Sequence, residues 1–156
     1  MNALQIILPG IIGLSAVVMA FFRRLPACLV AYIAFVAAAL LKVFAVPADR
    51  YLIWGFIAVI DTVNIYASRI EPPKSMHIYT VVGCFVGCLL GVAFYNTATV
   101  MIGGFLGAIL GFIAYTRTPV GRLWNAPMSH KLSILAASGC SAWFTFILAA
   151  TVALSY

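Results

Sequence analysis

Long apolar runs alternate with short polar breaks along this chain, and the pattern predicts an all-α bundle of membrane-spanning helices. A helix needs about 20 mostly apolar residues to cross the hydrocarbon core of a bilayer, with a range of about 17–25. Six segments meet or approach this length: residues 4–22, 25–44, 51–68, 78–94, 99–115 and 132–154. We therefore predict one integral membrane domain, residues 1–156, whose first segment is retained as a span rather than cleaved as a signal peptide. In an alternative with five spans, the first segment, which contains Pro9-Gly10, is re-entrant or interfacial.

The fourth and fifth predicted spans each carry three glycines spaced four residues apart. The two triplets are mirror images about Thr97, so antiparallel helices joined by a turn at residues 95–98 would bring the glycines level with one another. In a bilayer, apolar burial does not drive helix association, and small residues instead let two backbones approach closely. The sequence therefore predicts a glycine-zipper hairpin; alternatively, the glycines face a second subunit and make a homo-oligomer. The glycines are Gly83, Gly87, Gly91, Gly103, Gly107 and Gly111.

Small residues also recur in the last predicted span, where they predict a face that packs against the hairpin. Each lies four residues after the one before it. They are Ala137, Ser141, Thr145, Ala149 and Ala153.

Composition narrows the class of protein to integral membrane proteins. The chain is 65% hydrophobic and 8% charged, and its mean hydropathy is +1.16. Soluble domains are roughly 25% charged, so a soluble fold would have to expose much of this apolar surface. The net charge of +6 is spread between the apolar runs rather than clustered on one face, which argues against nucleic acid as a partner. The lipid bilayer is the partner that the composition predicts.

The basic residues predict the orientation in the membrane. Short loops that are rich in Lys and Arg stay in the cytoplasm. The first, third and fifth predicted loops hold seven basic residues, and the opposite side holds two, Lys42 and Arg50. Both termini are therefore predicted to lie outside the cytoplasm. The seven are Arg23, Arg24, Arg69, Lys74, Arg117, Arg122 and Lys131.

Asp61 is the one carboxylate inside a predicted span, ten residues after Tyr51 and so near the middle of the membrane. A charge at that depth costs about 2.5–3.5 kcal/mol on insertion scales. Asn64 lies three residues further on, on the same helical face. One interpretation is a polar proton or cation site in a small transporter or channel component. The other is a structural carboxyl group bonded to a neighbouring helix, and the sequence leaves both open.

Other chemistry is sparse. His77, Cys84 and Cys88 share a helical face, but His77 lies some seven residues from Cys84 and no fourth ligand is evident, so no metal site is predicted. The chain has no Ser–His–Asp set, paired carboxylates, phosphate-binding loop or dinucleotide motif. We therefore expect no enzymatic activity, no catalytic residue and no cofactor.

The second half of the chain resembles a family of small bacterial membrane proteins, the domain of unknown function 456. The resemblance rests on the two glycine runs, 83–91 and 103–111, the short turn between them and the apolar span that follows. It implies a location in the bacterial inner membrane and a fold, but no activity. The sequence therefore predicts a structural, assembly or oligomerisation role, alone or in a larger membrane complex. The alternative is the transporter or channel component with its polar site at Asp61 and Asn64.

Overall fold

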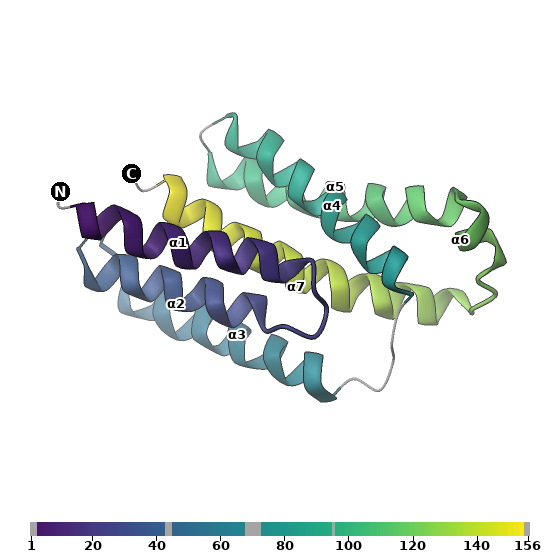
Figure 1. Ribbon diagram of the computed structural model, residues 1–156, viewed down its shortest axis with the longest axis horizontal. Helices are drawn as coiled ribbons and strands as arrows, with labels where there is room; N and C mark the ends of the chain where they lie inside the picture. The colour runs from purple at the N-terminus through teal and green to yellow at the C-terminus, as the bar shows by residue number, and fades with distance from the viewer. Residues whose placement is uncertain (1–2, 43–44, 68–72, 95, 155–156) are drawn as a thin grey trace. The chain divides into compact units, whose positions relative to one another are not determined.

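The computed structural model describes residues 3–42, 45–67, 73–94 and 96–154, and within these ranges every regular element is an α-helix. This confirms the prediction of an all-α fold for the described residues. Figure 1 shows the helices in chain order. Their bounds are α1 (Ala3–Ala20), α2 (Ala27–Leu40), α3 (Ala48–Ala67), α4 (Lys74–Val92), α5 (Thr97–Arg117), α6 (Pro119–Leu123) and α7 (Met128–Leu154).

Three helices of the described chain, α4, α5 and α7, are long and apolar enough to cross a membrane. α1 and α2 contribute shorter apolar helices, 7–20 and 27–40. α3 has 20 residues, but it carries Asp49, Arg50 and Asp61. By length and composition, three of the predicted spans are thus helices that could cross a membrane, and the full number of six stays a prediction. The end of the second predicted span at residues 43 and 44 lies outside the described residues, as does Ser68.

The short helix α6 lies within the fifth predicted loop. Thr118 begins it: its hydroxyl donates to the carbonyl of Tyr115 at 2.7 Å and accepts from the Gly121 N–H at 3.0 Å. Pro119 occupies the first turn, where a missing N–H is tolerated. Five residues are too few to give a hydrophobic period, so this element could not be read from the apolar pattern.

The described chain forms two compact units. Unit 1 comprises Met1–Ala67 and Phe144–Tyr156. In it the alanine face of α2 is buried, with Ala27, Ala31, Ala34 and Ala38 each at most 2% exposed. Such small side chains let helices pack closely, and the core they join contains residues of four helices. These are Ala16, Cys28, Ala31, Phe35, Ala38, Ala58, Leu148 and Val152.

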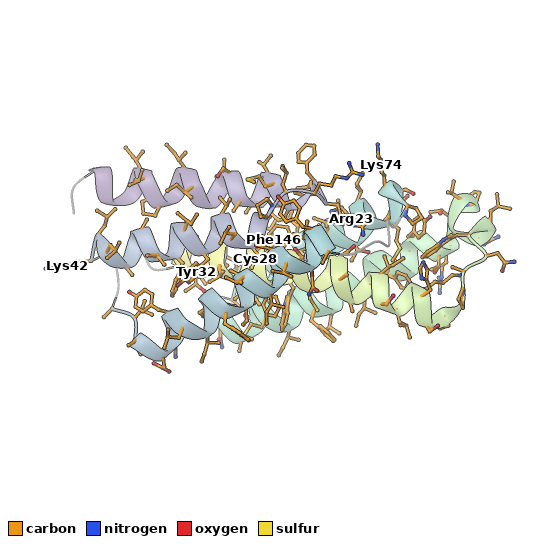
Figure 2. The ribbon with its side chains drawn as sticks, turned by 90° about the horizontal axis from the view of Figure 1, so that it is seen from below. Arg23, Cys28, Tyr32, Lys42, Lys74 and Phe146 are labelled. Atoms are coloured by element: carbon orange, nitrogen blue, oxygen red, sulfur yellow. The ribbon has the colours of Figure 1, made fainter. Side chains whose placement is uncertain are left out.

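Within unit 1, a hydrogen bond from Tyr32 links α2 to α3. The Tyr32 hydroxyl donates a hydrogen bond to the carbonyl of Tyr51 at 3.0 Å. Gly55 lies one turn further along α3, where a Cβ would stand 2.9 Å from the Tyr32 hydroxyl oxygen. Gly55 therefore leaves room for the Tyr32 ring. Figure 2 labels Tyr32 and Cys28 on α2.

Unit 2 comprises Ser68–Trp143. Figure 1 shows α4 and α5 running side by side as an antiparallel pair. The first part of α7 packs on them: a Cβ built on Gly139 would lie 3.6 Å from the Ala108 side chain on α5 and 3.7 Å from the Thr80 side chain on α4. A cluster near the start of α4 and the end of α5 completes the core. It contains Met76, Phe112, Tyr115 and Ile134, with Trp124 and Leu135 packed against it.

The face of α7 that packs differs from the predicted one. Ala137 and Ala153 are exposed, whereas Ser138 and Ala142 are buried. Residues spaced by four drift by about 40° per step, because a helix turns about 100° per residue. Over the four steps from residue 137 to residue 153 the drift is about 160°, so the five small residues cannot share one face of a straight helix. Of the five, Thr145 is buried, Ser141 and Ala149 are half-buried, and Ala137 and Ala153 are exposed, so the prediction that all five form one packing face was wrong.

Candidate functional site

The backbones of α4 and α5 approach each other closely at their glycines. A Cβ built on Gly87 would overlap the carbonyl oxygen of Gly103 and lie 3.2 Å from the Cα of Gly107. The same holds one turn away, where a Cβ on Gly83 would overlap the Gly107 oxygen and lie 2.9 Å from the Cα of Gly111. Only a residue without a side chain fits at these positions, since the opposing atoms belong to backbone.

The mirror pattern pairs Gly91 with Gly103, but in the structure Gly91 faces a slightly different part of α5. A Cβ on Gly91 would lie 2.5 Å from the Thr99 oxygen and 2.5 Å from the Val100 Cα, so the backbone facing Gly91 is about one turn before Gly103. A Cβ on Gly103 meets Gly87 first and the Gly91 nitrogen only at 3.7 Å. The structure thus places all six glycines at the helix pair, with Gly91 against the turn-proximal end of α5.

Hydrogen bonds stabilise the end of the helix pair that lies nearest the turn. Asn96 caps α5, its side-chain oxygen accepting from the Ala98 N–H at 2.9 Å. The Thr99 hydroxyl lies 2.8 Å from the Gly91 carbonyl and 2.6 Å from the Asn96 carbonyl, within donating distance of both. Gly91 lies in the last turn of α4, and its carbonyl also accepts from the Phe94 N–H at 3.2 Å, so the Thr99 hydroxyl links the first turn of α5 to the last turn of α4. Thr99 was not singled out from the sequence, although it stands eight residues after Gly91.

The helix α7 supports the pair from one side. The Trp143 indole N–H donates to the carbonyl of Met101 at 2.8 Å, and the ring lies against Phe105 at 6.0 Å. A Cβ on Gly104 would lie 2.9 Å from the Trp143 ring and 2.5 Å from the Cys88 sulfur. Gly104 therefore leaves room for side chains of both α4 and α7, whereas Gly103 and Gly107 leave room for the backbone of α4.

The opposite side of the pair is an open apolar groove, which we call the α4–α5 groove, with a volume of about 790 Å³. Its floor is formed by the glycines, which add no side chain. Its rims are large apolar side chains that are between 42% and 64% exposed. The rim residues are Val82, Val86, Leu90, Ile102, Leu106 and Leu110.

Asp61 and Asn64, the two polar candidates of α3, differ in their solvent exposure. Asp61 is 9% exposed, close enough to Cys28 on α2 to interact with it electrostatically. Asn64 is exposed. Thr62, beside them, donates its hydroxyl proton to the carbonyl of Ala58 at 2.7 Å, one turn back in the same helix. Asn64 follows Asp61 by three residues, which turns its side chain by about 300° around the helix axis. This offset leaves the Asp61 carboxylate buried and the Asn64 amide exposed.

His77, Cys84 and Cys88 are all buried in α4, as sharing a helical face requires. The Cys88 thiol lies 3.7 Å from the carbonyl of Val100 on α5 and donates to it. Among the described residues there is no group of three or more His, Cys, Asp or Glu side chains that could hold a metal ion.

Aromatic residues gather where α4 begins and α5 ends. Tyr115 is 1% exposed and lies 5.9 Å from Tyr79 and 6.2 Å from Trp124, ring centre to ring centre. The Lys131 ammonium stands 5.3 Å from the centre of the Trp124 ring, a cation–π distance. This cluster was not predicted from the sequence, because its members are far apart along the chain.

Comparison with known proteins gives no match: no protein-family model, no curated protein and no solved structure matches the chain.

Proposed function

We propose that this chain is a small polytopic inner-membrane protein with a structural or assembly role and with no enzymatic reaction of its own. In this proposal it crosses the membrane six times, and α4 and α5 form a glycine-zipper hairpin. The observation that supports it most is the backbone approach of Gly83, Gly87 and Gly107. These residues maximise packing between helices and present no reactive group to a substrate.

Helix lengths and charge support the six spans. At about 1.5 Å per residue, α1 and α3 are about 27 Å and 30 Å long, near the thickness of the hydrocarbon core. The 14 residues of α2 give about 21 Å, which local thinning of the bilayer accommodates. The bias of seven basic residues against two favours termini outside the cytoplasm. The resemblance to the domain of unknown function 456 supports a bacterial inner membrane.

Topology is tested by cysteine labelling. In a variant with all four cysteines replaced by alanine, single cysteines are introduced at Ser129, predicted cytoplasmic, and at Thr97, predicted external. A membrane-impermeant maleimide applied to spheroplasts should label Thr97→Cys and leave Ser129→Cys unlabelled until the membrane is broken. Labelling of both from outside contradicts the orientation.

The assembly role is tested on intact cells. Chemical crosslinking followed by mass spectrometry should recover the chain joined to a second copy or to other membrane proteins. Gly87→Leu should reduce those crosslinks, because it separates α4 from α5, whereas Gly10→Leu at an open site should not. Recovery of an uncrosslinked monomer at native abundance contradicts an assembly role.

The alternative is a transporter or channel component that uses Asp61 and Asn64. The buried carboxylate of Asp61 favours it, since ionisable groups inside membrane helices commonly mark ion or proton paths. The exposure of Asn64 argues against a single convergent polar site. The test is ion flux measured in vesicles that contain the purified protein. A flux that Asp61→Asn abolishes supports transport, whereas a flux no higher than that of empty vesicles rules it out.

A further inference from the structure

The α4–α5 groove is apolar along its length and charged at one end only. It runs from Ile78 and Ala114 at one end to Phe94 and Thr99 at the other. Lys74 lies four residues before Ile78, and Arg117 lies three residues after Ala114. Residues three or four apart share a helical face, so both cations extend the groove walls by one turn at the same end. Both side chains are exposed, and Figure 2 shows Lys74 extending outward at the start of α4.

The other end of the groove has no such charge. From Leu89 to Gly104 the sequence contains no Lys, Arg, Asp or Glu. The groove therefore has the polarity of a single phospholipid: a long apolar body and one end that attracts a phosphate. Its volume of about 790 Å³ lies within the range of about 300–1,000 Å³ that is usual for sites of small ligands.

We propose that the α4–α5 groove binds one anionic phospholipid, with an acyl chain on the glycine floor and the phosphate between Lys74 and Arg117. The proposal rests on the membrane location proposed above and adds a specific ligand to it. The lipid comes from the leaflet on the side of these two residues. The exposed Tyr79 lies at the same end of the groove.

A second copy of the chain fits the groove less well than a lipid. Copies inserted in the same direction are related by an axis along the membrane normal, and a two-fold interface places each patch against itself. Lys74 and Arg117 of both copies would then meet at one depth with no acidic side chain beside them in α4 or α5. An anionic headgroup neutralises these charges instead of doubling them.

The test is lipid retention by the full chain, measured by native mass spectrometry after extraction from nanodiscs. The nanodiscs contain phosphatidylglycerol and phosphatidylcholine with identical acyl chains. We expect the wild-type protein to retain one phosphatidylglycerol in preference to phosphatidylcholine. Each basic residue near a headgroup strengthens binding about fivefold. Lys74→Gln with Arg117→Gln should therefore weaken phosphatidylglycerol binding roughly 25-fold and leave phosphatidylcholine binding unchanged.

Two matched controls separate a site from general surface charge. Arg122→Gln with Lys131→Gln removes the same charge from the same predicted side, outside the groove, and should change retention less than twofold. Leu106→Trp fills the groove and should abolish retention of the lipid, whereas Leu52→Trp, on an exposed position of α3, should not. An equal loss in both double variants, or undiminished retention in Leu106→Trp, overturns the proposal.

Failure of this proposal is distinguishable from failure of the proposed function. A chain that spans the nanodisc and labels with the predicted topology, yet shows no lipid preference, loses only the lipid site. A dimer that Leu106→Trp converts to a monomer also overturns it, since the groove is then an interface between copies. A chain that does not enter the bilayer at all removes both proposals together.

Discussion

Replacing Gly107 with alanine adds one methyl group where the backbones of α4 and α5 approach each other closely. That methyl would overlap the Gly83 carbonyl oxygen and lie 2.9 Å from the carbonyl carbon of the same residue. It would also lie 3.2 Å from the Cα of Gly87. All of these atoms belong to backbone, so no side chain can rotate away, and the two helices have to move apart.

The size of the effect follows from these distances. Ordinary contacts begin at about 3.4 Å, so the carbonyl carbon at 2.9 Å must retreat by 0.5 Å (3.4 − 2.9) and the oxygen by more. Overpacking of this kind costs about 1–3 kcal/mol. Alanine meanwhile gains about 1 kcal/mol over glycine in helix propensity. A second glycine is therefore needed to separate the two contributions.

Gly10 provides that reference. It lies in α1, and a Cβ built on it meets nothing within 4 Å. Gly10→Ala should raise stability by about 0.5–1 kcal/mol, because only the propensity term acts. Subtracting the two variants cancels that term and leaves the packing penalty, for which we expect about 3 kcal/mol, the upper end of the overpacking range, since both neighbours are backbone.

The assay is reversible unfolding of the purified chain in mild detergent, titrated with SDS and followed by tryptophan fluorescence and circular dichroism. We expect the midpoint for Gly107→Ala to fall clearly below that of wild type while Gly10→Ala stays at or above it. A difference between the two variants of less than about 1 kcal/mol would refute the claim that backbone contact at Gly107 holds the pair together.

Three further substitutions test local features by the same unfolding measurement. Lys42, just after the end of α2, has a φ of 58°, a left-handed conformation that favours glycine. Lys42→Gly should therefore raise stability by about 1 kcal/mol, whereas Lys42→Ala, which removes the same charge, should not. Equal effects of the two substitutions would contradict this explanation. The Tyr115 hydroxyl is buried and finds no hydrogen-bond partner among the described residues, so Tyr115→Phe should leave stability unchanged or raise it by about 1 kcal/mol, and a clear loss would show an unrecognised bond. Gly55→Ala should cost about 1 kcal/mol by displacing the Tyr32 hydroxyl from its bond, and less in a Tyr32→Phe background; additive effects would show that the two residues do not interact.

The sequence predicted the helical class and the pair of helices because both depend on short-range patterns. A triplet such as Gly83, Gly87 and Gly91 drifts by only about 80° over its two steps, so it remains one face of a helix. The structure accordingly brings all three to the backbone of α5. The same rule explains the failure in α7, where five residues at the same spacing span about 160° and do not form a face.

Contacts between residues far apart in the chain could not be predicted from the sequence. The bond from Trp143 to Met101 joins positions 42 apart, and nothing in either local pattern indicates it. The α4–α5 groove likewise depends on where α7 packs and which side it leaves open. Asp61 could be singled out by its charge alone, but its burial depends on α2, and the exposure of Asn64 was not predictable from its spacing.

The short turn between α4 and α5 also has a consequence for biosynthesis. The backbone contacts of the pair join residues no more than 32 positions apart, from Tyr79 to Gly111, and contacts that are local in sequence form early because little loop entropy opposes them. The pair can therefore assemble while the ribosome is still making α7. The last helix would then meet a finished surface, and a slow step in making the protein is expected at the docking of α7 rather than at the glycines.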